Sequence, residues 1–183
     1  MNNYYNFNTD KNRLGDIGEW MIAMFTNSVL SESKVDSKKD MTDIRTKETR
    51  EVKCQPQHPT KHVMSVGENQ IPKCTSVDHL NFVKYDKSDI IVGLEVLNKN
   101  DYERYTTSQG WNMAGWKISD MQVLFELHNP ELARLMRSLS SSSQFPNKLP
   151  PIRTFQELGK AGILDLISKS KIVNNSAQLS FDL

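Results

Sequence analysis

The sequence lacks the features that mark several large classes of protein. No apolar run approaches the ~20 residues that a membrane-spanning helix needs, and the first residues, MNNYYNFNTDKNR, contain no signal-peptide core. Two cysteines are too few for a disulfide scaffold, so we expect reduced thiols. A net charge of +1 excludes a uniformly basic, histone-like DNA binder. These absences predict a soluble, cytoplasmic protein that has no membrane partner.

The composition is that of one folded domain. Hydrophobic residues make up 37% and charged residues 25% of 183 residues, and a chain of this length can bury a core without disulfides. Serine and proline oppose helix continuation, and they gather at about 140–151, where we expect a connector. We therefore expect a single domain over residues 1–173 and a flexible polar tail over 174–183.

Periodicity and capping residues predict three helices. Apolar residues recur at helical spacing over 11–26, which indicates an amphipathic helix. Asn129-Pro130 is typical of the start of a second helix. Thr154 and Glu157 have the spacing of a capping box, which begins a third helix that we expect to end near Ile172.

Four segments carry strand signals, namely 41–46, 50–55, 89–97 and 121–127. The first two flank the polar turn Lys47-Glu48-Thr49 and predict a hairpin. The third is apolar along most of its length, as expected for a central strand covered on both faces. The order helix, hairpin, strand, strand, helix, helix predicts an α/β fold with a short mixed β-sheet flanked by helices.

The predicted hairpin carries the candidate chemistry. Strand alternation places Glu51, Lys53 and Gln55 on one face of the second strand. A turn centred on Lys47 places Asp43 opposite Glu51, so the two carboxylates lie close together. Adjacent carboxylates repel each other, and a shared divalent cation relieves that repulsion.

The ligands that this hairpin offers are hard oxygen atoms. Asp43, Glu51 and the carbonyl of Val52 suit Mg²⁺ or Mn²⁺. Lys53 faces the same way as Glu51 and could orient or deprotonate an attacking water and offset the charge of a phosphate. Asp40 competes with Asp43 for the position opposite Glu51. Pairing Asp40 with Glu51 would centre the turn on an arginine and a threonine, which are less favourable turn residues. We therefore expect Asp43, rather than Asp40, to lie opposite Glu51.

The same residues resemble the PD-(D/E)XK nuclease superfamily. Thr42-Asp43, a turn, and Glu51-Val52-Lys53-Cys54-Gln55 are similar to its motif, in the subset with glutamine two residues after the lysine. Thr42 stands where the family has proline. The segment from Gly18-Glu19 to Ala23 resembles the opening helix of the family, whose glutamate often joins the metal site. The family core is a helix, a three-stranded meander, a helix and a strand, and it resembles the order predicted above.

This resemblance implies a restriction-endonuclease-like core and a metal-dependent endodeoxyribonuclease that uses Mg²⁺ or Mn²⁺ to hydrolyse DNA. The implied metal ligands are Asp43, Glu51, Val52 and Glu19. Lys53 becomes the catalytic lysine, and Glu19 and Gln55 become supporting residues. Two alternatives stay open: a compact restriction endonuclease acting as a homodimer rather than a monomer, and a catalytically inactive DNA-processing adaptor.

Other residues have plainer interpretations. Four side chains could supply zinc ligands: Cys54, His58, His62 and Cys74. Their spacing matches no common zinc motif, so we expect buried thiols and loop histidines. Trp111 and Trp116 lie in a glycine-containing segment, and we expect core packing for both.

The last six residues carry a second resemblance. Gln178-Leu179-Ser180-Phe181-Asp182-Leu183 is similar to the motif Gln-Leu-x-Leu-x-Leu that docks bacterial proteins onto the DNA polymerase sliding clamp. The resemblance implies that Gln178 bonds at the rim of a pocket, which Leu179, Phe181 and Leu183 fill. Docking would deliver the protein to replicating DNA. The competing interpretation is a tail that folds back onto its own core.

Overall fold

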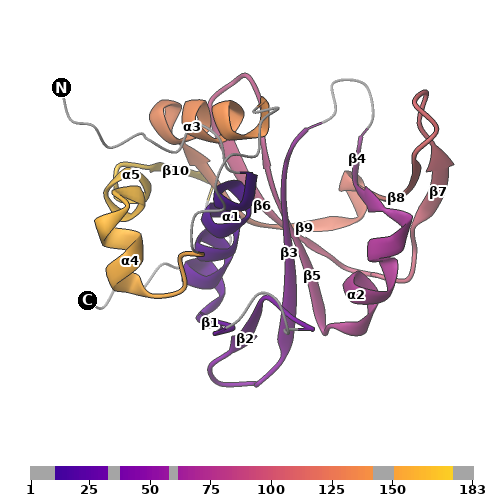
Figure 1. Cartoon of the computed structure of the whole chain (residues 1–183), viewed down its shortest axis with the longest axis horizontal. Helices are drawn as coiled ribbons and strands as arrows, with labels where there is room; N and C mark the ends of the chain where they lie inside the picture. Colours follow the sequence, from indigo (N-terminus) through magenta and orange to yellow (C-terminus); the bar gives the residue numbers. More distant parts are fainter. Residues whose placement is uncertain (1–10, 33–37, 58–61, 142–150, 175–183) are drawn as a thin grey trace.

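The computed structural model describes residues 11–32, 38–57, 62–141 and 151–174 (Figure 1). The helices are α1 (Lys11–Thr26), α2 (Ile71–Ser76), α3 (Pro130–Ser141), α4 (Phe155–Lys160) and α5 (Ile163–Ser168), with the 3-10 turns η1 (Glu68–Gln70) and η2 (Ile118–Asp120). The larger sheet contains β1 (Ser28–Leu30), β2 (Met41–Asp43), β3 (Thr49–Pro56), β5 (His79–Tyr85), β6 (Ile90–Val96), β9 (Met121–His128) and β10 (Lys171–Asn174). The smaller sheet contains β4 (Val63–Gly67), β8 (Asn112–Lys117) and β7 (Glu103–Thr106).

A seven-stranded mixed sheet, in the order β1-β2-β3-β5-β6-β9-β10, divides the molecule into two sides (Figure 1). The strands β1, β2 and β3 form an antiparallel meander, whereas β3 and β5 are parallel. Parallel neighbours require a crossover over one face of the sheet. Here the crossover consists of β4, η1 and α2, so α2 lies on the face that the smaller sheet also covers (Figure 1). The crossover brings side chains from η1 and α2 next to β3.

Each face of the large sheet has its own apolar core. On one face α1, α3, α4 and α5 pack against the sheet, and the rings of Phe25 and Phe125 stack with centroids 4.2 Å apart. Gly18 permits the close approach of α1, because a Cβ there would lie 2.7 Å from Cβ of Cys54 on β3. On the other face the small sheet and α2 bury a second core around Phe82 and Trp116.

The predicted helix starts are confirmed. The first helix spans Lys11–Thr26. At the start of α3 the Asn129 side chain accepts a hydrogen bond from the Leu132 amide at 2.9 Å. Thr154 and Glu157 form the expected capping box at α4.

The end of the third predicted helix is wrong. Gly162 adopts a left-handed conformation, with φ 73°, and separates α4 from a second short helix, α5. Residues 171–174 then form β10, which pairs with β9. The helix α3 continues to Ser141, at the start of the predicted connector. The rest of the connector and the tail, 142–150 and 175–183, lie outside the described residues.

The α/β fold with a mixed sheet flanked by helices is confirmed, but the sheet is larger than the short one expected. Neither β5 nor the three strands of the small sheet was predicted from the sequence. The strand β5 carries His79, Asn81 and Lys84 among apolar residues, which obscures its strand pattern. Among the described helices, none has both the length and the apolar character needed to cross a membrane.

Candidate functional site

The register of the β2–β3 hairpin differs from the one expected. Met41 pairs with Arg50 and Thr42 with Thr49, and the Asp43 amide donates to the Glu48 carbonyl at 2.8 Å. Asp43 therefore lies opposite Glu48. The prediction that Asp43 lies opposite Glu51 is wrong.

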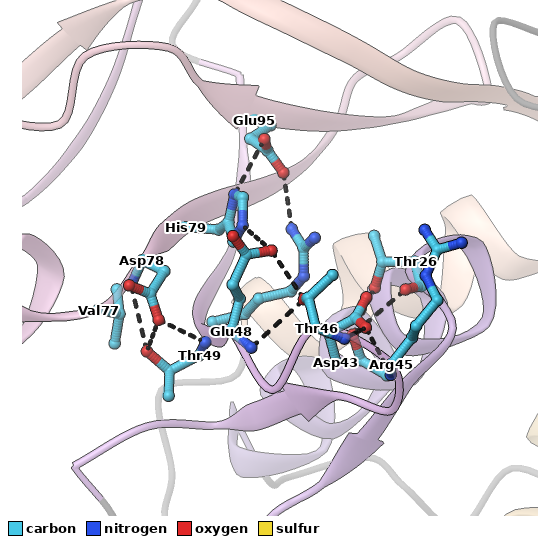
Figure 2. Close-up of polar contacts among 12 residues, drawn as sticks. Thr26, Asp43, Arg45, Thr46, Glu48, Thr49, Val77, Asp78, His79 and Glu95 are labelled. Carbon is cyan, nitrogen blue, oxygen red and sulfur yellow. Dashed lines mark hydrogen bonds and ion pairs between the residues drawn. The ribbon is translucent and has the colours of Figure 1, made fainter.

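Asp43 instead stabilises the turn itself. Its Oδ1 accepts hydrogen bonds from the amides of Arg45 and Thr46, both at 2.8 Å (Figure 2). These bonds, first the one from Thr46, lower the pKa of the exposed Asp43 carboxyl from its ordinary value. Lys47 completes the turn in a left-handed conformation, with φ 66°. An aspartate whose carboxylate accepts hydrogen bonds from the amides two and three residues later is a common turn signal. Asp43 therefore marks the true position of the turn, which had been predicted around Lys47.

Asp40 takes the position expected for Asp43. The Asp40 amide donates to the Arg50 carbonyl at 2.9 Å, which extends the hairpin pairing beyond β2. Asp40 Oδ2 accepts the Val52 amide at 2.8 Å, and Asp40 is 9% exposed. The aspartate beside Glu51 is therefore Asp40.

Glu51 lies at the centre of a compact charged cluster. It is fully buried, and its Oε1 lies 2.6 Å from Nζ of Lys53, on the same face of β3 as predicted. Its Oε2 lies 2.8 Å from Nζ of Lys73 on α2. Lys73 Nζ is also 3.2 Å from Asp40 Oδ1, so its ammonium group bridges the two carboxylates. Gln70 of η1 accepts a hydrogen bond from Lys53 Nζ at 3.2 Å.

Burial and charge act on this cluster in opposite directions. Burial, followed by the charge of Asp40, raises the pKa of Glu51, while the two lysines partly offset the effect. Burial alone would lower the pKa of Lys73, but its hydrogen bond to Glu51 and the charges of Asp40 and Glu51 outweigh this and raise the pKa. The two carboxylates thus share the ammonium group of Lys73 as a counter-ion.

The chemistry of the donor atoms fits a hard divalent cation. Asp40 and Glu51 supply carboxylate oxygens at a position that already holds a positive group. Across the part of the chain that the structure describes, no group of three or more His, Cys, Asp or Glu side chains is placed to hold a metal. An ion bound by the pair would take further oxygen ligands from the backbone, such as the Val52 carbonyl, and from water, as Mg²⁺ commonly does.

Glu19, expected at the metal site, lies elsewhere. It is on α1, 5% exposed, and forms an ion pair with Arg153. Burial and the charge of Glu19 raise the pKa of Cys54. Cys54 is on the face of β3 opposite Glu51, because side chains alternate along a strand. Gln55 does share the face of Glu51 and Lys53.

The four possible zinc ligands do not form one site. Cys54 packs beside Gly18 in the core under α1, whereas Cys74 is fully buried in the core on the other face of the sheet. Burial raises the pKa of Cys74 to about 11, as expected for an inert thiol. His58 lies outside the described residues, as do the four residues of the clamp-like motif, Gln178, Leu179, Phe181 and Leu183.

Lys73 and Gln70 were not predicted from the sequence to belong to the cluster. Pro72 near the first turn of α2 is a helix-start signal that could have located the element. No sequence signal shows that this helix crosses over β3, because the parallel pairing with β5 decides its place.

A second polar network lies on the α1 face, at the hairpin end of β3. Arg50 Nη1 lies 2.6 Å from Glu95 Oε2. The His79 ring lies 3.1 Å from Glu95 and 3.3 Å from Glu48 (Figure 2). Burial favours a raised pKa for Glu95, but Arg50 and His79 together lower it. The charges of this network are paired with one another, and it joins the β2–β3 turn to β5 and β6. We therefore assign it a structural role.

The chain matches no family model and no curated protein.

Proposed function

We propose that this protein is a metal-dependent endodeoxyribonuclease that hydrolyses phosphodiester bonds in DNA. The observation that carries the proposal is the convergence of Asp40, Glu51 and Lys53 at the start of β3, where one ammonium group already bridges both carboxylates. The order α1, meander β1–β2–β3, α2, β5 supports it, because, apart from β4 and η1 inserted before α2, it follows the core order of the PD-(D/E)XK superfamily. In this proposal Asp40 replaces Asp43, and Glu19 leaves the metal site.

Each residue has a definite task in the proposed reaction. Asp40, Glu51 and the Val52 carbonyl would hold Mg²⁺ or Mn²⁺, which supplies an activated water and stabilises negative charge on the phosphate. Lys53 offsets charge at the phosphate or orients the attacking water, and Gln70 holds its Nζ in place. The clamp-like residues 178–183 would deliver the enzyme to replicating DNA.

Two matched substitutions test the proposal. Asp40→Asn and Asp43→Asn both keep a side-chain oxygen that can accept the amide hydrogen bonds seen in the structure. With supercoiled DNA and Mg²⁺, the wild type should nick the DNA, and EDTA should stop it. Asp40→Asn should lose at least about 100-fold in rate, more than the loss of an outer-sphere partner of a metal ligand costs. Asp43→Asn should stay within a few-fold of the wild type.

The opposite result, with Asp43→Asn inactive and Asp40→Asn active, would assign the metal to the turn. A wild-type protein that binds supercoiled, single-stranded or branched DNA but cleaves none of them would instead be the DNA-processing adaptor. Cleavage whose rate rises with the square of protein concentration would favour the homodimeric restriction endonuclease.

A further inference from the structure

Lys73 occupies the place between Asp40 and Glu51 that a divalent cation would take. We propose that Lys73 is an internal counter-ion, which holds the two buried carboxylates adjacent until a metal ion displaces it. The proposal rests on the metal site of the proposed function, and it adds that the metal ion and the Lys73 ammonium compete for one position.

The geometry shows which group is able to leave. Glu51 is fully buried on β3, and Asp40 is held by the Val52 amide at 2.8 Å. The Lys73 side chain is 34% exposed and reaches the carboxylates from α2, on a flexible four-carbon stem. Rotation of this side chain toward solvent would free both carboxylates and leave the strand backbone unchanged.

The charge balance gives the reason for displacement. Two carboxylates, Asp40 and Glu51, face two ammonium groups, Lys53 and Lys73, so the cluster is neutral as it stands. A divalent ion added beside both lysines would place four positive charges against two negative ones within a few ångströms. Release of one ammonium lowers that repulsion.

The contacts select Lys73, rather than Lys53, as the group that leaves. Lys53 lies two residues from Glu51 on the same strand, where it contacts Oε1 of Glu51 and donates a hydrogen bond to Gln70. Lys73 is the cation that contacts both carboxylates, so it occupies the shared position. Lys53 can therefore remain beside the metal ion for its proposed role in the reaction.

Metal titrations of folded protein, without DNA, test this proposal. Mg²⁺ and Mn²⁺ binding would be measured by titration calorimetry and by the melting temperature for the wild type, Lys73→Met and Lys73→Gln. Both variants should bind metal about 5- to 150-fold more tightly, the range typical of coupling between two ligands. Lys73→Met should also melt at a lower temperature without metal, because two carboxylates then repel each other.

Two further variants serve as controls. Lys73→Arg keeps the bridging charge and should bind metal much as the wild type does. Lys169→Met removes an exposed lysine that pairs with Asp165 on α5, and it should change neither metal affinity nor the metal-free melting temperature. Lysine-selective ¹³Cε labelling adds a readout on the wild type itself. The Lys73 signal, assigned from its loss in Lys73→Arg, should shift on addition of metal.

The outcomes separate this proposal from the proposed function. Equal metal affinity for the wild type, Lys73→Met and Lys73→Gln would overturn the competition and leave the metal site intact. Weaker metal binding by both variants would show that Lys73 assists metal binding rather than competing with the metal ion. Folded proteins that bind no divalent metal at all would overturn the metal site itself. If Lys73→Met does not fold, Lys73→Gln and the lysine signal still decide the matter.

Discussion

At the scale of single residues, hydrogen bonds give chemically identical side chains different tasks. Asp40 and Asp43 are three positions apart, and each accepts amide hydrogen bonds. Asp43 accepts those of its own turn in solvent, whereas Asp40 accepts one from the neighbouring strand and is nearly buried beside Glu51. A carboxylate near a second buried carboxylate needs a cation, and one in solvent does not.

The tryptophans show a similar contrast, and one of the two core expectations is wrong. Trp116 is 1% exposed, packs against Phe82 with ring centroids 5.9 Å apart, and donates its Nε1–H to the Lys99 carbonyl at 3.1 Å. Trp111 is 69% exposed, at the turn of the β7–β8 hairpin, beside Gly110 with φ 83°. The two side chains differ because Trp116 lies on the inner face of β8 and Trp111 precedes that strand.

This contrast predicts the fluorescence of the protein. Trp20 and Trp116 are 8% and 1% exposed, so iodide should quench mainly Trp111. Trp111→Phe should remove the quenchable part of the emission and leave the melting temperature unchanged, because an exposed side chain contributes little burial energy. If iodide quenches the emission of Trp111→Phe as strongly as that of the wild type, the exposed placement of Trp111 is contradicted.

At the scale of elements, one glycine decides where a helix ends. The apolar spacing after Thr154 continues through 158–167, and a single long helix would satisfy it. Gly162 has φ 73°, which costs other residues about 1–2 kcal/mol, and the chain turns there between α4 and α5. The break separates α5 from α4, and the residues that follow α5 form β10 at the edge of the sheet.

Two glycine substitutions test this break. Gly162→Ala should lower the free energy of unfolding by about 1–2 kcal/mol, since alanine is strained at positive φ. Gly159→Ala should raise it by about 0.5–1 kcal/mol, because Gly159 lies within α4 and a Cβ there would meet no atom within 4 Å. Urea denaturation of both variants measures these two changes in the free energy of unfolding. Equal effects would show that residues 155–168 form one helix rather than two.

At the scale of the whole molecule, contacts from the C-terminal segment hold α1 in place. The Trp20 indole donates to the Ile152 carbonyl at 3.0 Å, and Arg153 donates to the Ser31 carbonyl at 2.9 Å and pairs with Glu19. These contacts join residues more than 120 positions apart along the chain. They give Glu19 a structural role, in place of the metal-site role that the resemblance implied.

Substitution of the buried arginine tests that assignment. Arg153→Met should lower the free energy of unfolding by about 3–5 kcal/mol, because it leaves the buried carboxylate of Glu19 without this partner. Arg104→Met, at an exposed ion pair with Glu68, should leave the melting temperature unchanged.

Glu19→Gln should lower the melting temperature without changing the Mg²⁺ concentration that gives half-maximal DNA cleavage. A large rise in that concentration would return Glu19 to the metal site.

The sequence by itself determined the features that depend on neighbours along the chain. Periodicity and caps located α1 and the starts of α3 and α4, because helix contacts span three or four residues. Strand alternation placed Glu51, Lys53 and Gln55 on one face, because side chains of a strand have a period of two. The position of the β2–β3 turn was predicted wrongly because it depends on a single capping residue, Asp43. A shift of register changes the cross-strand partner of every residue in the hairpin.

Tertiary structure decided the rest of the candidate site. Lys73 and Gln70 reach Glu51 and Lys53 because the parallel pairing of β3 with β5 forces the chain to cross over that face. Glu19 points to Arg153, which follows it by more than a hundred residues. Such contacts join segments far apart in sequence, and only the packing of the whole sheet brings their side chains together.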